Sequence, residues 1–420
     1  MIQKNKEIDI PEDNIFSNDK LDRKEVIEDL SKLLVSTHEP FVLGINASWG
    51  AGKTTFVKLW KAYLENELSI HSVYFSAWED DFSKEPLIAI MGELNSYIEN
   101  NFPKDKNLHK QFEELKNVSG KIIKRGLPAF IKGATAGALD FDKGVESAIG
   151  AVTESVAKEL IDSYENDKAI TIEFKELLHD IIEQIDSEKP LIIFIDELDR
   201  CRPLYAIELL ERLKHVFGIE KLIFVLSIDK KQLSESIKSQ YGDIDTGNYL
   251  RRFIDLEFKL NNLKTKNFIT YLDERYKFYK VIETKGYVYD DYYYIDTLWH
   301  FSELLSLREI ENIFLRLNII ARTIETAYQL RIAYSNPVDI FNIITFVLLI
   351  KEKLFTTYDG KDANELISEL SRKQEASVIY ARIYEYFVKN IQVKYSNHDT
   401  LLAKISFAIK KIDFTSSFGL

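Results

Sequence analysis

A glycine-rich turn between a short apolar run and an amphipathic segment constrains this chain more than any other feature. Residues 41–45 (FVLGI) are apolar enough for a buried strand, residues 47–54 read ASWGAGKT, and residues 54–68 carry apolar side chains at helical spacing. A strand, a glycine turn and a helix in this order favour phosphate binding, because backbone N–H groups and the positive helix end converge on the anion. The segment therefore predicts a P-loop.

The residues of the predicted loop have distinct expected roles. Lys53 is expected to place its ammonium group against the β- and γ-phosphates of ATP, and Thr54 to present its hydroxyl to Mg²⁺. The usual pattern, G-x-x-x-x-G-K-[ST], has glycine where this chain has Ala47, so the match is to a relaxed form of the motif. The residues expected to bind the nucleotide are Trp49, Gly50, Ala51, Gly52, Lys53, Thr54 and Thr55.

Two carboxylates at the end of a second apolar run are the next feature that indicates function. Residues 190–195 (PLIIFI) predict a strand buried on both faces, and Asp196 and Glu197 follow it directly. Open α/β sheets bind their ligands at the carboxyl ends of the strands. We expect Asp196 to hold Mg²⁺ through water and Glu197 to orient and polarise the attacking water. The chain is therefore predicted to be a magnesium-dependent ATPase.

The order of the segments predicts the fold class. Apolar strands at residues 72–78 and 222–228 join those at 41–45 and 190–195, with helical segments between them, so we expect an α/β fold. It is a doubly wound parallel sheet of the P-loop NTPase type, with a helical insertion and a helical C-terminal domain. The predicted parts are the N-terminal half of the core at 1–100, the insertion at 101–189, the C-terminal half of the core at 190–260, and a helical lid or C-terminal domain at 261–420.

Composition limits the compartment and the partners. The net charge of -12 argues against a general nucleic-acid coat, which would need clustered Lys and Arg. The single cysteine, Cys201, cannot form an internal disulfide and fits a reducing compartment. The polar N-terminal residues lack the apolar core of a secretory signal, and the apolar passages at 127–139 and 341–350 fall short of the roughly 20 residues of a spanning helix. We expect a cytoplasmic protein without an integral membrane segment.

The predicted insertion carries positive charges around a Gly/Ala-rich stretch at residues 126–151. Lys121, Lys124, Arg125 and Lys132 flank this apolar segment, a composition compatible with peripheral contact to an anionic membrane. A solvated helical hairpin or a protein interface is the favoured interpretation, because no strong amphipathic pattern is seen beside the charges.

Three segments resemble the KAP family of P-loop NTPases. They are residues 49–54 (WGAGKT), 75–78 (FSAW) and 196–203 (DELDRCRP), of which the last is the most specific. The resemblance extends to Asp229 and to residues 249–254 (YLRRFI), where arginine replaces the lysine of the family's Tyr-Leu-x-Lys segment. It implies an ATPase of the additional-strand, catalytic-glutamate class, although many members have Asp-Asp where this chain has Asp-Glu.

Two sensor positions are expected. The strand at 222–228 should lie between the P-loop strand and the acidic strand, which would bring Ser227 or Asp229 close to the γ-phosphate. Asp229 is equally well explained as the N-cap of the helix that follows it. In the C-terminal domain, residues 306–309 (SLRE) form a capping box that places Arg308 in the first turn of a helix. Arg308 resembles the second sensor of AAA-like ATPases, and a plain surface arginine is the alternative.

Several arginines near these motifs are candidates for an arginine finger, and two tryptophans beside them have two possible roles. An arginine finger stabilises the transition state from a neighbouring subunit, so its presence implies a homo-oligomer. Trp49 and Trp78 are expected to pack the edge of the sheet in preference to stacking on adenine, since aromatic side chains mostly serve packing. The candidates for the finger are Arg200, Arg202, Arg251 and Arg252.

These observations lead to two functional hypotheses. The first is an oligomerising ATPase whose nucleotide cycle controls an effector or partner protein, and the resemblance connects its family with bacterial defence against phages. The second is an ATP-gated scaffold or switch with little turnover. The presence of both Asp196 and Glu197 favours turnover.

Overall fold

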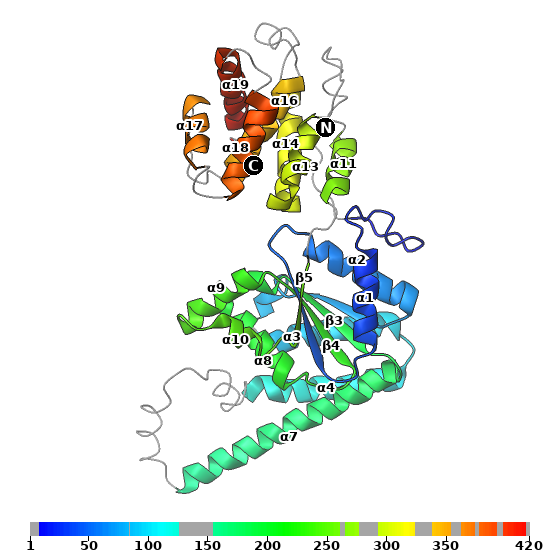
Figure 1. Ribbon diagram of the computed structural model, residues 1–420. Helices are drawn as coiled ribbons and strands as arrows, with labels where there is room; N and C mark the ends of the chain where they lie inside the picture. The colour runs from blue at the N-terminus through cyan, green and yellow to red at the C-terminus, as the bar shows by residue number, and fades with distance from the viewer. Residues whose placement is uncertain are drawn as a thin grey trace. The chain divides into compact units, whose positions relative to one another are not determined.

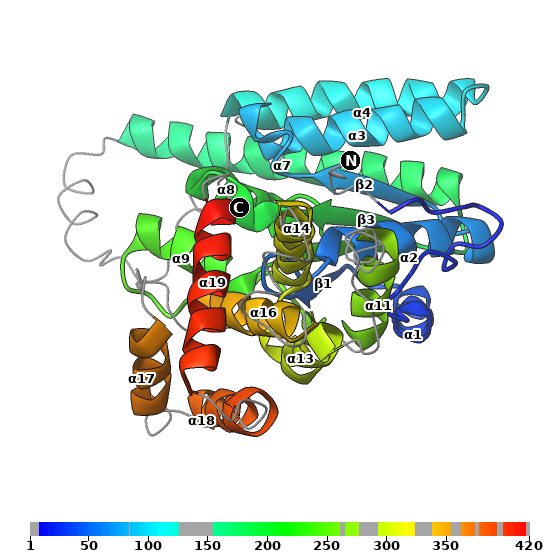
Figure 2. The ribbon, with the colours of Figure 1, turned by 90° about the horizontal axis from the view of Figure 1, so that it is seen from above.

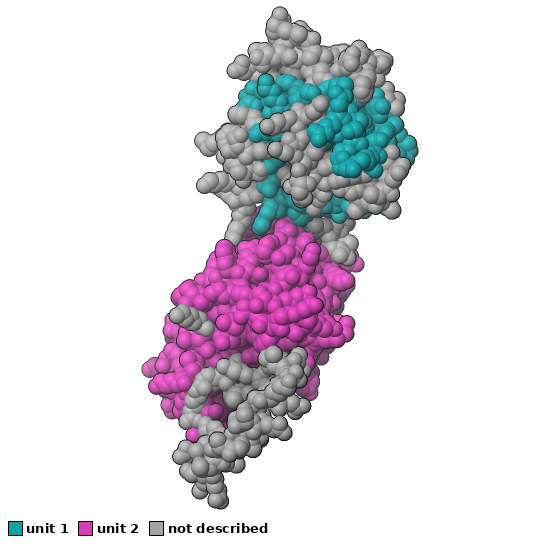
Figure 3. Space-filling view, turned by 90° about the vertical axis from the view of Figure 1, so that its left-hand side faces the viewer, with its two compact units in different colours: residues 1–7, 19–22, 262–420 teal, residues 8–18, 23–261 magenta. Residues whose placement is uncertain are grey.

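The chain forms two compact units. The structure is a computed structural model that describes residues 8–83, 85–125, 154–260, 265–276, 293–323, 338–353, 363–373, 378–392 and 398–416. We call residues 8–18 and 23–261 the sheet unit, and residues 262–420 with the short stretch 19–22 the helical unit (Figure 3). Each unit has its own hydrophobic core.

Five parallel strands form the centre of the sheet unit (Figure 1). They are β1 (Phe41–Asn46), β2 (Ser72–Ser76), β3 (Leu191–Asp196), β4 (Leu222–Ile228) and β5 (Leu256–Lys259), in the spatial order β2-β3-β4-β1-β5. β4 pairs with β1 on one side and with β3 on the other. The expected placement of this strand between the P-loop strand and the acidic strand is therefore confirmed, as is the α/β fold class.

Helices cover both faces of the sheet because β3 and β4 are apolar on both faces. Ile193 and Ile195 of β3 belong to one core cluster, whereas Ile192 and Phe194 belong to the other. Figure 2 shows α3, α4 and α7 on one side of the sheet and α1 on the other. The helices that share the first cluster are α3 (Pro86–Asn101), α4 (Lys106–Arg125), α7 (Glu154–Ile185), α8 (Pro203–His215), α9 (Lys230–Tyr241) and α10 (Thr246–Leu250). Those that share the second are α1 (Lys24–Val35) and α2 (Lys53–Leu68).

Two helices of the sheet unit begin in different ways. Pro86 is the first residue of α3, and the Glu85 side chain accepts a hydrogen bond from the backbone N–H of Leu87. Asp19 or Asp22 would have been a conventional cap for α1, but its N-cap is Arg23, which makes no side-chain cap bond. Asp22 instead has a φ of 56°.

The short edge strand β5 was missed by the sequence analysis. Its four residues, LEFK, alternate charged and apolar side chains and contain no apolar run. The strand exists because it pairs with β1, from Leu43 opposite Leu256 to Asn46 opposite Lys259. Tertiary pairing, and not local preference, selects this conformation.

The predicted insertion contributes two long helices to the sheet unit. α4 is amphipathic, contrary to the sequence interpretation, and its apolar side chains Leu108, Phe112 and Leu115 are buried in the core shared with α7. Residues 126–153, which include the Gly/Ala-rich stretch and Lys132, lie outside the described residues. The four-part division of the chain remains a prediction.

The helical unit contains no strand among its described residues. Residues 343–350 of α16 are all buried, so this apolar passage is a core helix. None of the helices described here has the length and apolarity needed to cross a membrane. The main helices of the unit are α11 (Thr265–Tyr276), α13 (Tyr293–Phe301), α14 (Leu307–Thr323), α16 (Val338–Lys353), α17 (Ala363–Lys373), α18 (Val378–Tyr386) and α19 (His398–Ser416).

Candidate nucleotide site

The glycine loop connects the carboxyl end of β1 to the amino end of α2. Gly50 and Gly52 have φ values of 79° and 80°, which glycine adopts without the steric cost of a Cβ atom. Ala47, which replaces the usual glycine, is not among the residues with positive φ, so alanine fits there without backbone strain. Its N–H donates to the carbonyl of Ile228 at the end of β4.

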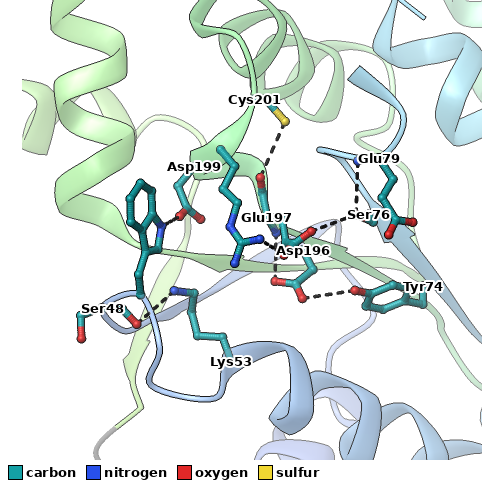
Figure 4. Close-up of polar contacts among 11 residues, drawn as sticks. Ser48, Lys53, Tyr74, Ser76, Glu79, Asp196, Glu197, Asp199 and Cys201 are labelled. Carbon is teal, nitrogen blue, oxygen red and sulfur yellow. Dashed lines mark hydrogen bonds and ion pairs between the residues drawn. The ribbon is translucent and has the colours of Figure 1, made fainter. Parts of the chain in front are cut away.

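The amino end of α2 provides backbone donors. Lys53, Thr54 and Thr55 form its first turn after the N-cap Gly52, and N–H groups in a first turn have no partner within their own helix. The Lys53 ammonium group donates to the carbonyl oxygens of Ala47 at 2.7 Å and Ser48 at 3.4 Å (Figure 4). The loop therefore brings together the backbone donors and the lysine expected of a phosphate cradle.

Carboxylates from two neighbouring strand ends surround Lys53. Only 8% of this residue is exposed, and burial lowers the pKa of its ammonium group, whereas the negative charges of Asp199, Asp229 and Asp196 act to raise it. Asp196 is the last residue of β3, Asp199 follows β3, and Asp229 follows β4. The sheet thus collects the Lys53 ammonium group, the Arg200 guanidinium and several carboxylates at a single edge. Open α/β sheets bind their ligands at this edge, so the arrangement suits a magnesium–phosphate complex.

Asp196 is fixed from both sides. It is 1% exposed, its Oδ1 accepts the backbone N–H of Glu197 at 2.9 Å, and its Oδ2 accepts the Tyr74 hydroxyl at 3.2 Å (Figure 4). Burial, and then the charge of Asp196, raise the pKa of the Tyr74 hydroxyl, so it stays protonated as the donor. Tyr74 belongs to β2, and its role was not foreseen from the sequence.

Glu197 turns the chain sharply after β3. Its φ is 62° and its ψ is 22°, a left-handed conformation. Its Oε2 accepts the Ser76 hydroxyl at 3.3 Å, and its Oε1 forms an ion pair with Arg200. Burial raises the pKa of the Glu197 carboxyl, and the Arg200 guanidinium opposes that rise. Both carboxylate oxygens therefore have a protein partner.

The oxygen donors at this edge suit a magnesium ion. Mg²⁺ takes oxygen ligands and usually binds proteins through one or two carboxylates while keeping several waters. Each Asp196 oxygen accepts one hydrogen bond and retains a lone pair, and Thr54, the second residue of α2, carries a hydroxyl in the first turn of that helix. Within the described parts of the chain, no group of three or more acidic, histidine or cysteine side chains forms an all-protein metal cage. The fit is thus to an ion shared with a phosphate.

The end of β4 presents Ser227 and Asp229. Ser227 is opposite Asp196 in the sheet register, and its buried hydroxyl oxygen has no hydrogen-bond partner. Asp229 is the N-cap of α9, since its Oδ1 accepts the N–H groups of Lys231 and Gln232. Its Oδ2 also accepts the N–H of Trp49 at 3.1 Å, which ties it to the P-loop. The capping interpretation of Asp229 is therefore correct, and a sensor role for either residue remains a prediction.

The candidate finger arginines have different surroundings. Arg200 pairs with Glu197, whereas Arg202 donates to Asp81 through its backbone N–H at 2.9 Å and its Nε at 2.7 Å. Arg251 and Arg252 are exposed. None of these contacts tests a role in a neighbouring subunit, so the finger remains a prediction.

Arg308 lies in the helical unit. The predicted capping box is confirmed, because the Ser306 N–H donates to Glu309 Oε2 at 2.6 Å and the Glu309 N–H donates to Ser306 Oγ at 3.3 Å. Arg308 follows in the first turn of α14 and is exposed. Its role as second sensor remains a prediction.

Trp49 and Trp78 do not pack the sheet as expected, since they are 44% and 51% exposed. The Trp49 indole N–H donates to Asp199 (Figure 4), and the guanidinium carbon of Arg200 lies 5.4 Å from the centre of the Trp78 ring. The packing prediction is wrong because both side chains extend from loops at the sheet edge, where polar partners and solvent replace a core.

Cys201, the single cysteine of the chain, has a structural role. Cys201 is buried, its Sγ is 3.7 Å from the carbonyl oxygen of Glu197, and burial raises the pKa of the thiol. A protonated buried thiol is a poor nucleophile. Cys201 therefore supports the turn after Glu197.

The strand order, the glycine loop and the acidic strand define this chain as a P-loop NTPase of the α/β class. The model of the KAP family P-loop domain matches residues 23–324, the greater part of the 420-residue chain. The chain belongs to the KAP family of P-loop NTPases.

Two similar solved structures are of the ORC2 protein of Aeropyrum pernix. The structure of its ADPNP-ADP complexes has 12% sequence identity and a TM-score of 0.32, with 94% of this chain and 86% of that chain covered. The ADP form has 14% identity and a TM-score of 0.29, with 96% and 85% covered. No curated protein matches it.

Proposed function

We propose that this protein hydrolyses ATP with Mg²⁺. The observation that carries the proposal is the closeness of Lys53 at the P-loop to Asp196 at the end of β3, which Glu197 follows directly. ATP is proposed over GTP because the family resemblance implies it.

The proposed reaction assigns one task to each group. The loop and the α2 amino end bind the phosphates, and Lys53 neutralises charge on the β- and γ-phosphates. Thr54 and Asp196 would hold Mg²⁺, which when bound neutralises charge that develops on the phosphate oxygens. Glu197 orients a water for in-line attack on the γ-phosphorus and accepts its proton. The bond to the β–γ bridging oxygen breaks, and ADP and phosphate leave.

Phosphate release by the purified protein with MgATP tests the proposal. Glu197→Gln keeps the size of the side chain but removes its basicity, so we expect phosphate release to fall about 100-fold or more while ATP binding persists. Lys53→Ala is expected to weaken ATP binding itself. Tight ATP binding by the wild type without phosphate release would instead support the ATP-gated scaffold with little turnover.

We further propose that the nucleotide cycle of a homo-oligomer controls a partner protein, with anti-phage defence as the setting. The support is the resemblance to the family. A protein interface stays the favoured role of the segment around Lys121 and Lys124, with peripheral membrane contact as the alternative. A cytoplasmic location belongs to the same proposal. Affinity purification of Glu197→Gln with ATP and with ADP, followed by sedimentation, tests it, since a partner or an oligomer controlled by the cycle would depend on the nucleotide.

A further inference from the structure

The Glu197 carboxylate is held between two side chains from different elements. Ser76, the last residue of β2, donates its hydroxyl to Oε2, and the two residues face each other in Figure 4. Arg200, three residues after Glu197, pairs with Oε1. The left-handed backbone of Glu197 and the 3₁₀ turn η2 (Leu198–Arg200) bring Arg200 back toward the carboxylate, and the Arg200 N–H donates to the Glu197 carbonyl at 3.0 Å.

Arg200 is itself held in place by an aromatic ring. Its guanidinium carbon lies 5.4 Å from the Trp78 ring centre, within the range of a cation–π contact. Trp78 is 51% exposed, so burial in the core does not explain where its ring lies. The planar guanidinium suits this arrangement, because it stacks with one face and donates hydrogen bonds from its edge.

We propose that Arg200 is a positioning residue for the hydrolytic water, acting through Glu197, with the Trp78 ring as its support. A water attacking the γ-phosphorus must lie within hydrogen-bond reach of the base and in line with the bond that breaks. Partners on both carboxylate oxygens restrict the rotation of the Glu197 side chain and leave a lone pair on each oxygen for that water. This inference rests on the proposed ATP hydrolysis.

The contacts favour an action within one subunit. A finger residue must reach the site of a neighbouring subunit, whereas Arg200 points toward Glu197 of its own chain and is 30% exposed as a side chain. The positioning proposal therefore has Arg200 act in the site of its own chain, whereas the finger prediction has it act in the site of a neighbouring subunit.

Steady-state phosphate release at fixed pH tests the proposal. Arg200→Gln should lower kcat about 10- to 100-fold, because misplacement of a reacting group by about 1 Å costs on that order, while KM for ATP stays within about threefold. Arg200→Lys retains the charge without the planar fork and should fall between Arg200→Gln and the wild type. Trp78→Ala should lower kcat about two- to fivefold, and Trp78→Phe, which keeps a ring, should lower it less.

The matched control is Arg372→Gln, which breaks another arginine–glutamate pair at the same spacing, with Glu369 in α17. It should leave kcat unchanged. An Arg200→Gln enzyme with wild-type kcat, or with raised KM alone, would overturn the positioning role but leave ATP hydrolysis standing. Absence of phosphate release from the wild type would overturn the proposed function and this inference with it.

Mixing two impaired variants separates the two assignments of Arg200. A mixture of Arg200→Gln and Glu197→Gln should be no more active than the sum of its parts if Arg200 serves its own Glu197. Restored activity in the mixture would show that an intact Arg200 completes the site of another subunit, which would overturn the proposal in favour of a finger.

Discussion

Glu197 has a backbone conformation that few glutamates adopt. At a φ of 62°, its Cβ approaches the following carbonyl oxygen, which costs about 1–2 kcal/mol. The same conformation returns the chain through η2 and so places Arg200 beside the carboxylate. Strain of this kind persists where the surrounding structure imposes it, and it is common at functional sites.

Removing the side chain at this residue should therefore relieve strain. We expect Glu197→Gly to be more stable than Glu197→Ala by about 0.5–1 kcal/mol in the free energy of unfolding of the sheet unit. Both variants lose the contacts of the carboxylate, and the larger backbone entropy of glycine offsets part of the relieved strain. Urea unfolding followed by tryptophan fluorescence is suitable, since three of the four tryptophans, Trp49, Trp60 and Trp78, belong to this unit. A less stable Glu197→Gly protein would show that the conformation is not strained.

At the scale of elements, the junction of β2 with α3 depends on pH. His71 precedes β2, and its Nδ1 lies 2.5 Å from the hydroxyl of Tyr97 on α3. Burial lowers the pKa of His71, although the charges of Asp186 and Glu65 oppose the shift and that of Lys189 adds to it. The folded protein therefore binds the proton less readily than the unfolded chain.

The sign of the pH effect follows from this difference. Above the ordinary histidine pKa near 6.5 both states are neutral at His71, and as the pH falls through 6.5 the unfolded chain gains the proton first, so stability declines. His71→Asn should lose stability less steeply than the wild type between pH 7.5 and pH 5.5 in urea unfolding. His38→Asn, at an exposed histidine, is the control, and equal slopes for wild type and His71→Asn would contradict the prediction.

At the scale of the whole molecule, the two units have separate cores, so a ligand can stabilise them unequally. MgATP at 100 times its Kd should add about 2.7 kcal/mol to the stability of the unit that binds it. Hydrogen exchange should show this protection in β1, β3 and β4, and Lys53→Ala should abolish it. Protection of α14 by MgATP that disappears in Arg308→Ala would support the second-sensor prediction. Protection of β1, β3 and β4 that is equal in Lys53→Ala and in the wild type would contradict binding at the P-loop.

Local sequence patterns determined the phosphate loop, the acidic strand and the fold class. The Gly50 and Gly52 turn, the apolar run before Asp196 and the helical spacing after Lys53 are each legible within a window of about 15 residues, because they reflect backbone sterics and periodic burial. β4 was placed correctly for the same reason. β5 was missed because an alternation over only four residues, with no apolar run, is too short a signal for a strand.

Only the tertiary structure decided how the site is assembled. Tyr74 and Asp196 are 122 residues apart in the chain, Ser76 and Glu197 are 121 apart, and Trp49 and Asp199 are 150 apart. The parallel register that sets Ser76 opposite Asp196 brings the strand ends together, and the left-handed turn at Glu197 then directs Arg200 back toward the carboxylate. The register is not encoded by a local preference, because it arises when the buried faces of neighbouring strands align.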